Sequence, residues 1–206
     1  MPSSIGRPAT APQAMPAKPT CLRFARLLLS TGALLLSAAI VASGASAASA
    51  VCAGAHLIPT TGNLSRIKAA TLCLVNQQRT GHGLKPLREN ADLQAAAQAH
   101  TAQMVRRDYF NHVGPAGDSP LERVTAAGYA SSAEIRDLGE NIAAASGSLA
   151  TPAASVAAWM ASPPHRAQIL NPAFHDTGIG VVAAVPTALG IGRSGATYAE
   201  DFGTRR

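Results

Sequence analysis

The pattern of apolar residues predicts two long amphipathic helices in the first half of the chain. From Leu64 to about Arg79, apolar and small side chains recur on one side at helical spacing, and two glycines follow the segment. A second stripe begins after Asn90, a residue type typical of N-caps, and continues to about Asp108. Each helix is expected to bury one face against the rest of the domain.

Prolines that follow Ser or Thr indicate where three shorter helices begin and end. Ser119-Pro120 predicts a helix over residues 119–127, and Thr151-Pro152 predicts another over 152–161. Two further prolines, in SPPHRAQIL, end that helix and start a short helical turn.

Two β segments are predicted near the end of the sequence, at Gly178–Val185 and Ala196–Gly203. The connection between them is rich in Gly and Pro, which is typical of a hairpin with a long loop. Residues 110–137 have the composition of a loop apart from their short helix. Helices followed by a hairpin predict an α+β fold in which helices cover a small antiparallel sheet.

The first fifty residues have the features of an export signal. Basic residues precede the apolar run Leu27–Ala42, and small residues follow up to Ala50. That run is shorter than the roughly 20 residues that a membrane-spanning helix needs. We predict that 1–50 is a signal peptide cleaved near Ala47 or Ala50, which leaves a secreted protein without a stable membrane span. An uncleaved anchor is the alternative.

Removal of the signal also changes the charge of the protein. The whole chain has a net charge of +6, but four of its basic residues lie before position 51, which leaves thirteen basic against eleven acidic residues. This balance does not call for nucleic acid or an anionic membrane as a partner.

Cysteine usage agrees with export to an oxidising compartment. Cys21 is lost with the signal, and Cys52 and Cys73 remain as a pair. We predict that they form a disulfide, which staples the Gly- and Pro-containing linker 51–63 to the first helix. The alternative is two free thiols, whereas the lack of a C-x-x-C pattern argues against a zinc ribbon.

Histidine and carboxylate side chains occur in three polar segments. His112 follows Phe110, Glu140 follows Gly139, and His165 follows two prolines. Such groups can bind a metal, exchange protons or form structural hydrogen bonds. Their spacing matches no compact zinc motif, so it leaves these alternatives open. His100, which lies on an apolar helical stripe, is expected to be a packed histidine with one ring nitrogen satisfied.

Several motifs occur in an order that resembles a known family. They are LVNQQRTGHGLKPL, LQAAAQAHTAQM, YFNH, SPLERVTAAGY, LGENIAAA, WMASPPHRAQILNPAFHDTGIGV and YAEDFG. Together they resemble the CAP superfamily of cysteine-rich secretory, antigen 5 and pathogenesis-related 1 proteins, in its bacterial, secreted, single-domain branch. The resemblance covers about Leu72 to Gly203. It implies that residues 64–206 form a CAP domain with a three-layer α-β-α sandwich around a central antiparallel sheet.

The resemblance also implies which residues form the site. The family's cavity is lined by two histidines and two acidic residues, which map here to His112, His165 and Glu140 and to the position of Ser162, where the second acid is missing. The expected site therefore holds Zn²⁺ or another divalent metal through His112, His165 and Glu140, with Ser162 and Asn141 lining the cleft.

Other polar residues near these motifs are expected to have structural roles. Ser162 is expected to cap the short helix that follows it, and Asn141 to order its loop through backbone hydrogen bonds. Arg166 is expected to be solvated and Glu122 to lie on the surface. His175 is a minor candidate for the site.

Three functions remain open at this point. The favoured one is a secreted binding module for a metal, a small lipid, a peptide or a cell-wall component, with no established catalysis. A metal-dependent peptide or ester hydrolase that uses Glu140 as general base is the alternative. The third is an extracellular structural protein with a vestigial cleft. No G-x-S-x-G motif supports a serine hydrolase.

Overall fold

The computed structural model describes residues 51–192 and 194–206. The predicted signal peptide and its cleavage site lie outside these residues. Four strands form one sheet in the order β1-β3-β4-β2. The strands are β1 (Arg88–Glu89), β2 (Ile135–Ser146), β3 (Asp176–Val182) and β4 (Gly195–Arg205). The three long strands pair antiparallel, and the short β1 pairs parallel with the start of β3.

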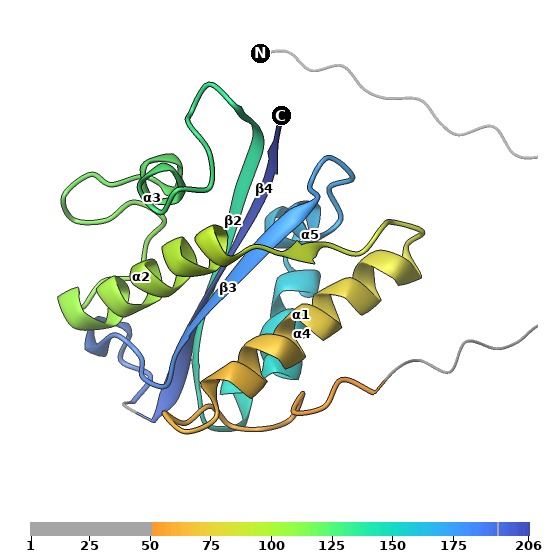
Figure 1. The fold of residues 1–206 in the computed structure, drawn as a ribbon. Helices are drawn as coiled ribbons and strands as arrows, with labels where there is room; N and C mark the ends of the chain where they lie inside the picture. Colours follow the sequence, from red (N-terminus) through yellow and green to blue (C-terminus); the bar gives the residue numbers. More distant parts are fainter. Residues whose placement is uncertain (1–50, 193) are drawn as a thin grey trace, which may run out of the picture. The chain divides into compact units, whose positions relative to one another are not determined.

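Helices cover both faces of this sheet, as Figure 1 shows. They are α1 (Leu64–Gly81), α2 (Ala91–Arg107), α3 (Pro120–Ala126), α4 (Pro152–Ala161) and α5 (Pro163–Ile169), with 3₁₀ turns at Gly147–Ala150 and Thr187–Leu189. The helices α2 and α3 lie on one face, and α1, α4 and α5 lie on the other. The α-β-α sandwich expected from the resemblance is therefore confirmed.

The helices begin where the local capping signals predict. The side chain of Asn90 accepts hydrogen bonds from the backbone N–H groups of Asp92 and Leu93 at the start of α2. Ser119 and Glu122 form a capping box at α3, so the predicted surface position of Glu122 is correct. Thr151 caps α4 by accepting a hydrogen bond from the backbone N–H of Ala154.

The prediction of two β segments missed the strand Ile135–Ser146, whose first residues fall in the segment 110–137 that was expected to be loop. This strand is β2, and it pairs with β4 from Ile135 to Ser146. Its alanines show no alternation of apolar and polar residues, so the segment has no strand signal of its own. The strand is formed because β4, far downstream, provides its hydrogen-bonding partner.

Close contact between α2 and the sheet depends on two glycines of β3. A Cβ atom on Gly178 or Gly180 would overlap the backbone of Leu93, Gln94 or Ala97 in α2. Glycine therefore lets this helix lie directly on the strand, which brings His100 of α2 over the sheet. On the opposite face, Trp159 of α4 is buried and donates its Nε1–H to the carbonyl oxygen of Ile142.

A disulfide ties the segment before α1 to the domain. Cys52 is bonded to Cys73, so the predicted pairing is confirmed. The same segment also reaches α4, where the backbone N–H of Ala153 donates to the carbonyl oxygen of Ala55 at 2.9 Å. Among the described residues, no helix has the length and hydropathy required to cross a membrane.

Replacing both Cys52 and Cys73 with Ser should lower the free energy of unfolding. The bond closes a loop with a sequence separation of 21 residues, and its loss should cost about 3 kcal/mol because the unfolded chain regains entropy. Urea denaturation of the oxidised protein and of the variant measures this. A reducing agent should destabilise the wild type by a similar amount and leave the variant unchanged. An unchanged urea midpoint for the variant would contradict the assignment.

Candidate functional site

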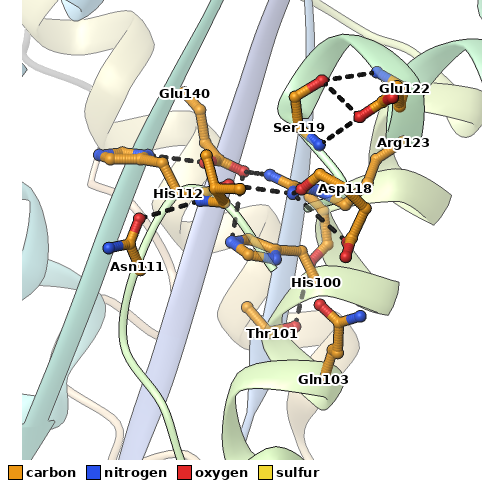
Figure 2. A network of polar contacts seen from close by, with 12 residues as sticks. His100, Thr101, Gln103, Asn111, His112, Asp118, Ser119, Glu122, Arg123 and Glu140 are labelled. Carbon is orange, nitrogen blue, oxygen red and sulfur yellow. Dashed lines mark hydrogen bonds and ion pairs between the residues drawn. The ribbon is translucent and has the colours of Figure 1, made fainter. Parts of the chain in front are cut away.

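Glu140 of β2 is at the centre of a network of polar side chains (Figure 2). Its side chain is only 2% exposed. One carboxylate oxygen, Oε1, lies 2.7 Å from Nδ1 of His112, and the other, Oε2, accepts a hydrogen bond of 2.7 Å from Nη2 of Arg123. Both oxygens are thus already bound by neighbouring side chains.

Arg123 of α3 connects this carboxylate to the loop that carries His112. Its Nη1 donates to the carbonyl oxygens of His112 at 3.0 Å and Asp118 at 2.9 Å. The guanidinium is buried, so these are charge-assisted bonds in a low dielectric. The sequence analysis did not identify this residue, because an Arg on a short surface helix usually reaches solvent.

The contact with Glu140 fixes the tautomer of His112. An ionised carboxylate can only accept hydrogen bonds, so Nδ1 of His112 carries the proton. The lone pair of the neutral ring is then on Nε2. The side chain of His112 is 47% exposed, so solvent can reach the ring that carries Nε2.

Ser162 holds the second histidine of the site instead of capping α5. Its Oγ lies 2.8 Å from Nδ1 of His165, and it makes no side-chain capping bond. The expected cap is wrong: Pro164 removes the donor at the second position of α5, and the hydroxyl contacts the ring of His165 instead of that residue's backbone N–H. Burial lowers the pKa of His165, and the charge of His112 lowers it further. The two imidazoles therefore act on each other electrostatically.

The adjacent residues Glu140 and Asn141 connect the two histidines to the same strand. Successive side chains of a strand point to opposite faces, and here Glu140 contacts His112 while Asn141 donates its Nδ2–H to the carbonyl oxygen of His165 at 3.1 Å. The predicted backbone bond of Asn141 is present, although the residue lies in a strand and not in a loop. The loop that carries His112 and the helix α5 that carries His165 are thus both attached to β2.

The electrostatics of the buried groups keep Glu140 ionised. Burial alone would raise its pKa, but the hydrogen bond from His112 and the charge of Arg123 outweigh burial and place the pKa below its ordinary value. Asp201 is opposite Glu140 in the register of β2 and β4. Burial and then the charge of Glu140 raise the pKa of Asp201 well above its ordinary value. The sequence analysis did not identify Asp201 as part of the site.

His100 lies beside this network as a packed residue. It is fully buried, and burial lowers its pKa, so the ring is neutral at neutral pH. Its Nδ1 lies 3.4 Å from the hydroxyl of Tyr109, while Nε2 is 3.8 Å from Oε2 of Glu140. This agrees with the expected structural role.

The remaining candidates lie elsewhere or are engaged in other contacts. Arg166 is exposed on α5, as expected. His175 lines a separate cavity next to Arg79 and Lys85. Within residues 51–192 and 194–206, no three His, Cys, Asp or Glu side chains are grouped so that they could hold a metal ion. The metal site of His112, His165 and Glu140 therefore stays a prediction.

Comparisons with known proteins agree on one family. The model of the CAP family, described as the cysteine-rich secretory protein family, matches residues 72–184. A Bacillus subtilis relative, the uncharacterized protein YkwD, is 38% identical over 109 residues, which are 53% of this chain and 40% of that protein. This chain thus matches less than half of that relative's length.

Two solved structures share the fold at low sequence identity. An extracellular SCP-domain protein of Bacillus anthracis matches with a TM-score of 0.55 and 22% identity over 71% of this chain and 44% of that one. An outer surface protein of Borrelia burgdorferi matches with a TM-score of 0.56 and 17% identity over 72% and 97% of the two chains. Since the family model spans more than half of the sequence and the architecture agrees, this chain belongs to the CAP family of cysteine-rich secretory proteins.

Proposed function

We propose that this protein is an exported CAP-domain binding module that holds a small extracellular ligand between His112 and His165. The observation that carries the proposal is that each of the two imidazoles is held through Nδ1. Each has its Nδ1 held by a neighbour, Glu140 for His112 and Ser162 for His165, so each Nε2 remains for a ligand. Export is supported by the disulfide and by relatives described as extracellular or outer surface proteins.

The donor set fits a divalent metal held by two nitrogens. A metal-binding His commonly donates its other ring N–H to a carboxylate or another fixed acceptor, as His112 does with Glu140. Glu140 itself does not fit as a ligand, because Arg123 and His112 already engage both of its oxygens. A zinc ion bound to His112 and His165 would have open positions that could accept a carboxylate or phosphate group of the ligand.

The hydrolase alternative has less support from this geometry. A general base must be free to accept a proton from water, and its pKa should be near the working pH. Glu140 has a lowered pKa and is bound at both oxygens. We therefore assign Glu140 a positioning role, in which it orients His112, and we propose binding without turnover. A small lipid, a peptide and a cell-wall component remain the classes of ligand to test.

Titration of residues 51–206 with zinc, after treatment with a chelator, tests the metal part of the proposal. Calorimetry should show saturable binding of about one ion per chain. Replacing both His112 and His165 with Ala should abolish it, whereas His175→Ala should bind as the wild type does. Glu140→Gln should weaken binding by about 10- to 100-fold, which is the effect of losing a group that orients a ligand. Equal binding by the wild type and the double variant would disprove this site.

The positioning role of Glu140 leads to a second prediction about stability. Arg123→Met leaves a buried carboxylate without its guanidinium and should lower the free energy of unfolding by about 3–5 kcal/mol. Adding Glu140→Gln removes the unpaired charge, so the double variant should be more stable than Arg123→Met alone.

These variants form a double-mutant cycle. Urea denaturation of the wild type, the two single variants and the double variant measures the free energy of unfolding of each. Arg166→Met is the matched control, because that side chain is exposed; its effect should stay within about 0.5 kcal/mol. If the two substitutions simply add, Glu140 and Arg123 are not coupled and the assignment fails.

A further inference from the structure

A cavity that neither His112 nor His165 lines is formed where two loops meet beside the start of the sheet. One wall is the segment from Gly83 to Arg88 after α1, and the other is the segment from Pro172 to His175 before β3. These segments are adjacent because β1 pairs with the start of β3 (Figure 1). The cavity has a volume of about 530 Å³, within the usual range for small-molecule sites.

The lining of this cavity combines positive charge with an apolar surface. Its ionisable side chains are all basic: Arg79, Lys85, Arg88 and His175. Arg88 is partly neutralised by Asp176 at 3.2 Å, whereas no carboxylate of the described residues forms an ion pair with Lys85. Leu84 and Phe174 are among the apolar residues of the lining. An anionic group attached to an apolar body would complement both features.

Arg79 holds the two walls of the cavity in place. Its buried guanidinium donates through Nε to the carbonyl oxygen of Lys85 in one wall and through Nη2 to that of Phe174 in the other. Its Nη1 donates to the carbonyl oxygens of Ile169 and Asn171. The cavity is therefore formed before any ligand arrives, which reduces the ordering that binding would require.

Three further hydrogen bonds fix the same walls. The backbone N–H of Arg88 donates to the carbonyl oxygen of His175 at 2.9 Å and joins the two segments directly. The side chain of Asn76 in α1 bonds to both the N–H and the carbonyl oxygen of Leu87.

The charge of Arg79 is not cancelled inside the protein at neutral pH. Carbonyl oxygens solvate the guanidinium, but they carry no net charge. The carboxyl group that acts on Arg79 electrostatically is Glu200 of β4, which is fully buried. Burial raises the pKa of Glu200 to about 8, so this group is mostly protonated at pH 7. A buried cation without a counter-ion raises the positive potential in the cavity beside it.

We infer that this cavity is a second binding site, which takes a small organic anion with a phosphate or carboxylate head group on an apolar or aromatic body. The head group would lie near Lys85 and His175, and the apolar body would contact Leu84 and Phe174. The site is separate from the His112 and His165 pair and does not depend on a metal.

Titration of residues 51–206, which remain after the predicted signal cleavage, can test this inference by amide NMR. Phenyl phosphate supplies both parts of the ligand, inorganic phosphate supplies the head group alone, and benzyl alcohol is a neutral aromatic control. A chelator in every sample prevents a metal at the histidine pair from binding the anion. Phenyl phosphate should shift amide signals of residues 83–88 and 173–175 saturably. Inorganic phosphate should bind more weakly, and benzyl alcohol should not saturate.

Variants separate a specific site from general attraction to a basic surface. Lys85→Gln combined with His175→Gln should weaken the binding of phenyl phosphate by about tenfold or more, as expected for lost charge-assisted contacts. Arg166→Gln, which removes an exposed cation elsewhere, should change the affinity by less than about twofold. Amide spectra of each variant verify its fold.

Three results would overturn the inference. They are the absence of saturable shifts with phenyl phosphate, equal affinity in the Lys85 and His175 double variant, and shifts that centre on His112 and His165. The last result would place the anion at the histidine pair even though the metal is chelated.

Discussion

The buried contact between Arg123 and Glu140 determines how the candidate site is built. The guanidinium binds one oxygen of Glu140 and also two carbonyl oxygens of the loop before α3, including that of His112. The other oxygen of Glu140 fixes the ring of His112. A single charged pair thus attaches a loop without regular structure to β2 and orients its histidine. Burying the pair has a desolvation cost, which the hydrogen bonds to both partners offset.

Much of the helical part of the fold could be predicted because its signals are local. Asn90, Ser119 and Thr151 each satisfy backbone donors a few residues downstream, so a short window of sequence is sufficient to place them. Strand β2 could not be predicted in the same manner. Its residues are small and lack alternation, and the strand exists because β4 pairs with it. That pairing joins segments with a long separation in sequence, which local patterns do not encode.

The candidate site was predictable to a similar, limited degree. The family resemblance identified His112, Glu140 and His165, and the structure connects all three through contacts with β2 and its neighbours. The resemblance did not identify Arg123 or Asp201. Charged residues are usually exposed, and only tertiary contacts show which ones are buried. The role of Ser162 was mistaken for a related reason. The hydroxyl contacts the ring of His165, which only the tertiary arrangement of that side chain shows.

Arg79 and Arg123 use the same chemistry with different electrostatic consequences. Both are buried, and both bind backbone carbonyl oxygens of loops that lack regular structure. Arg123 also contacts Glu140, whose pKa is lowered, so its charge is compensated and the field at the histidine pair is reduced. The carboxyl group that acts on Arg79 is Glu200, whose pKa of about 8 keeps it mostly neutral at pH 7. The positive potential therefore remains at the cavity beside Arg79, which suits the anion proposed there, whereas the charge of Arg123 is compensated beside His112.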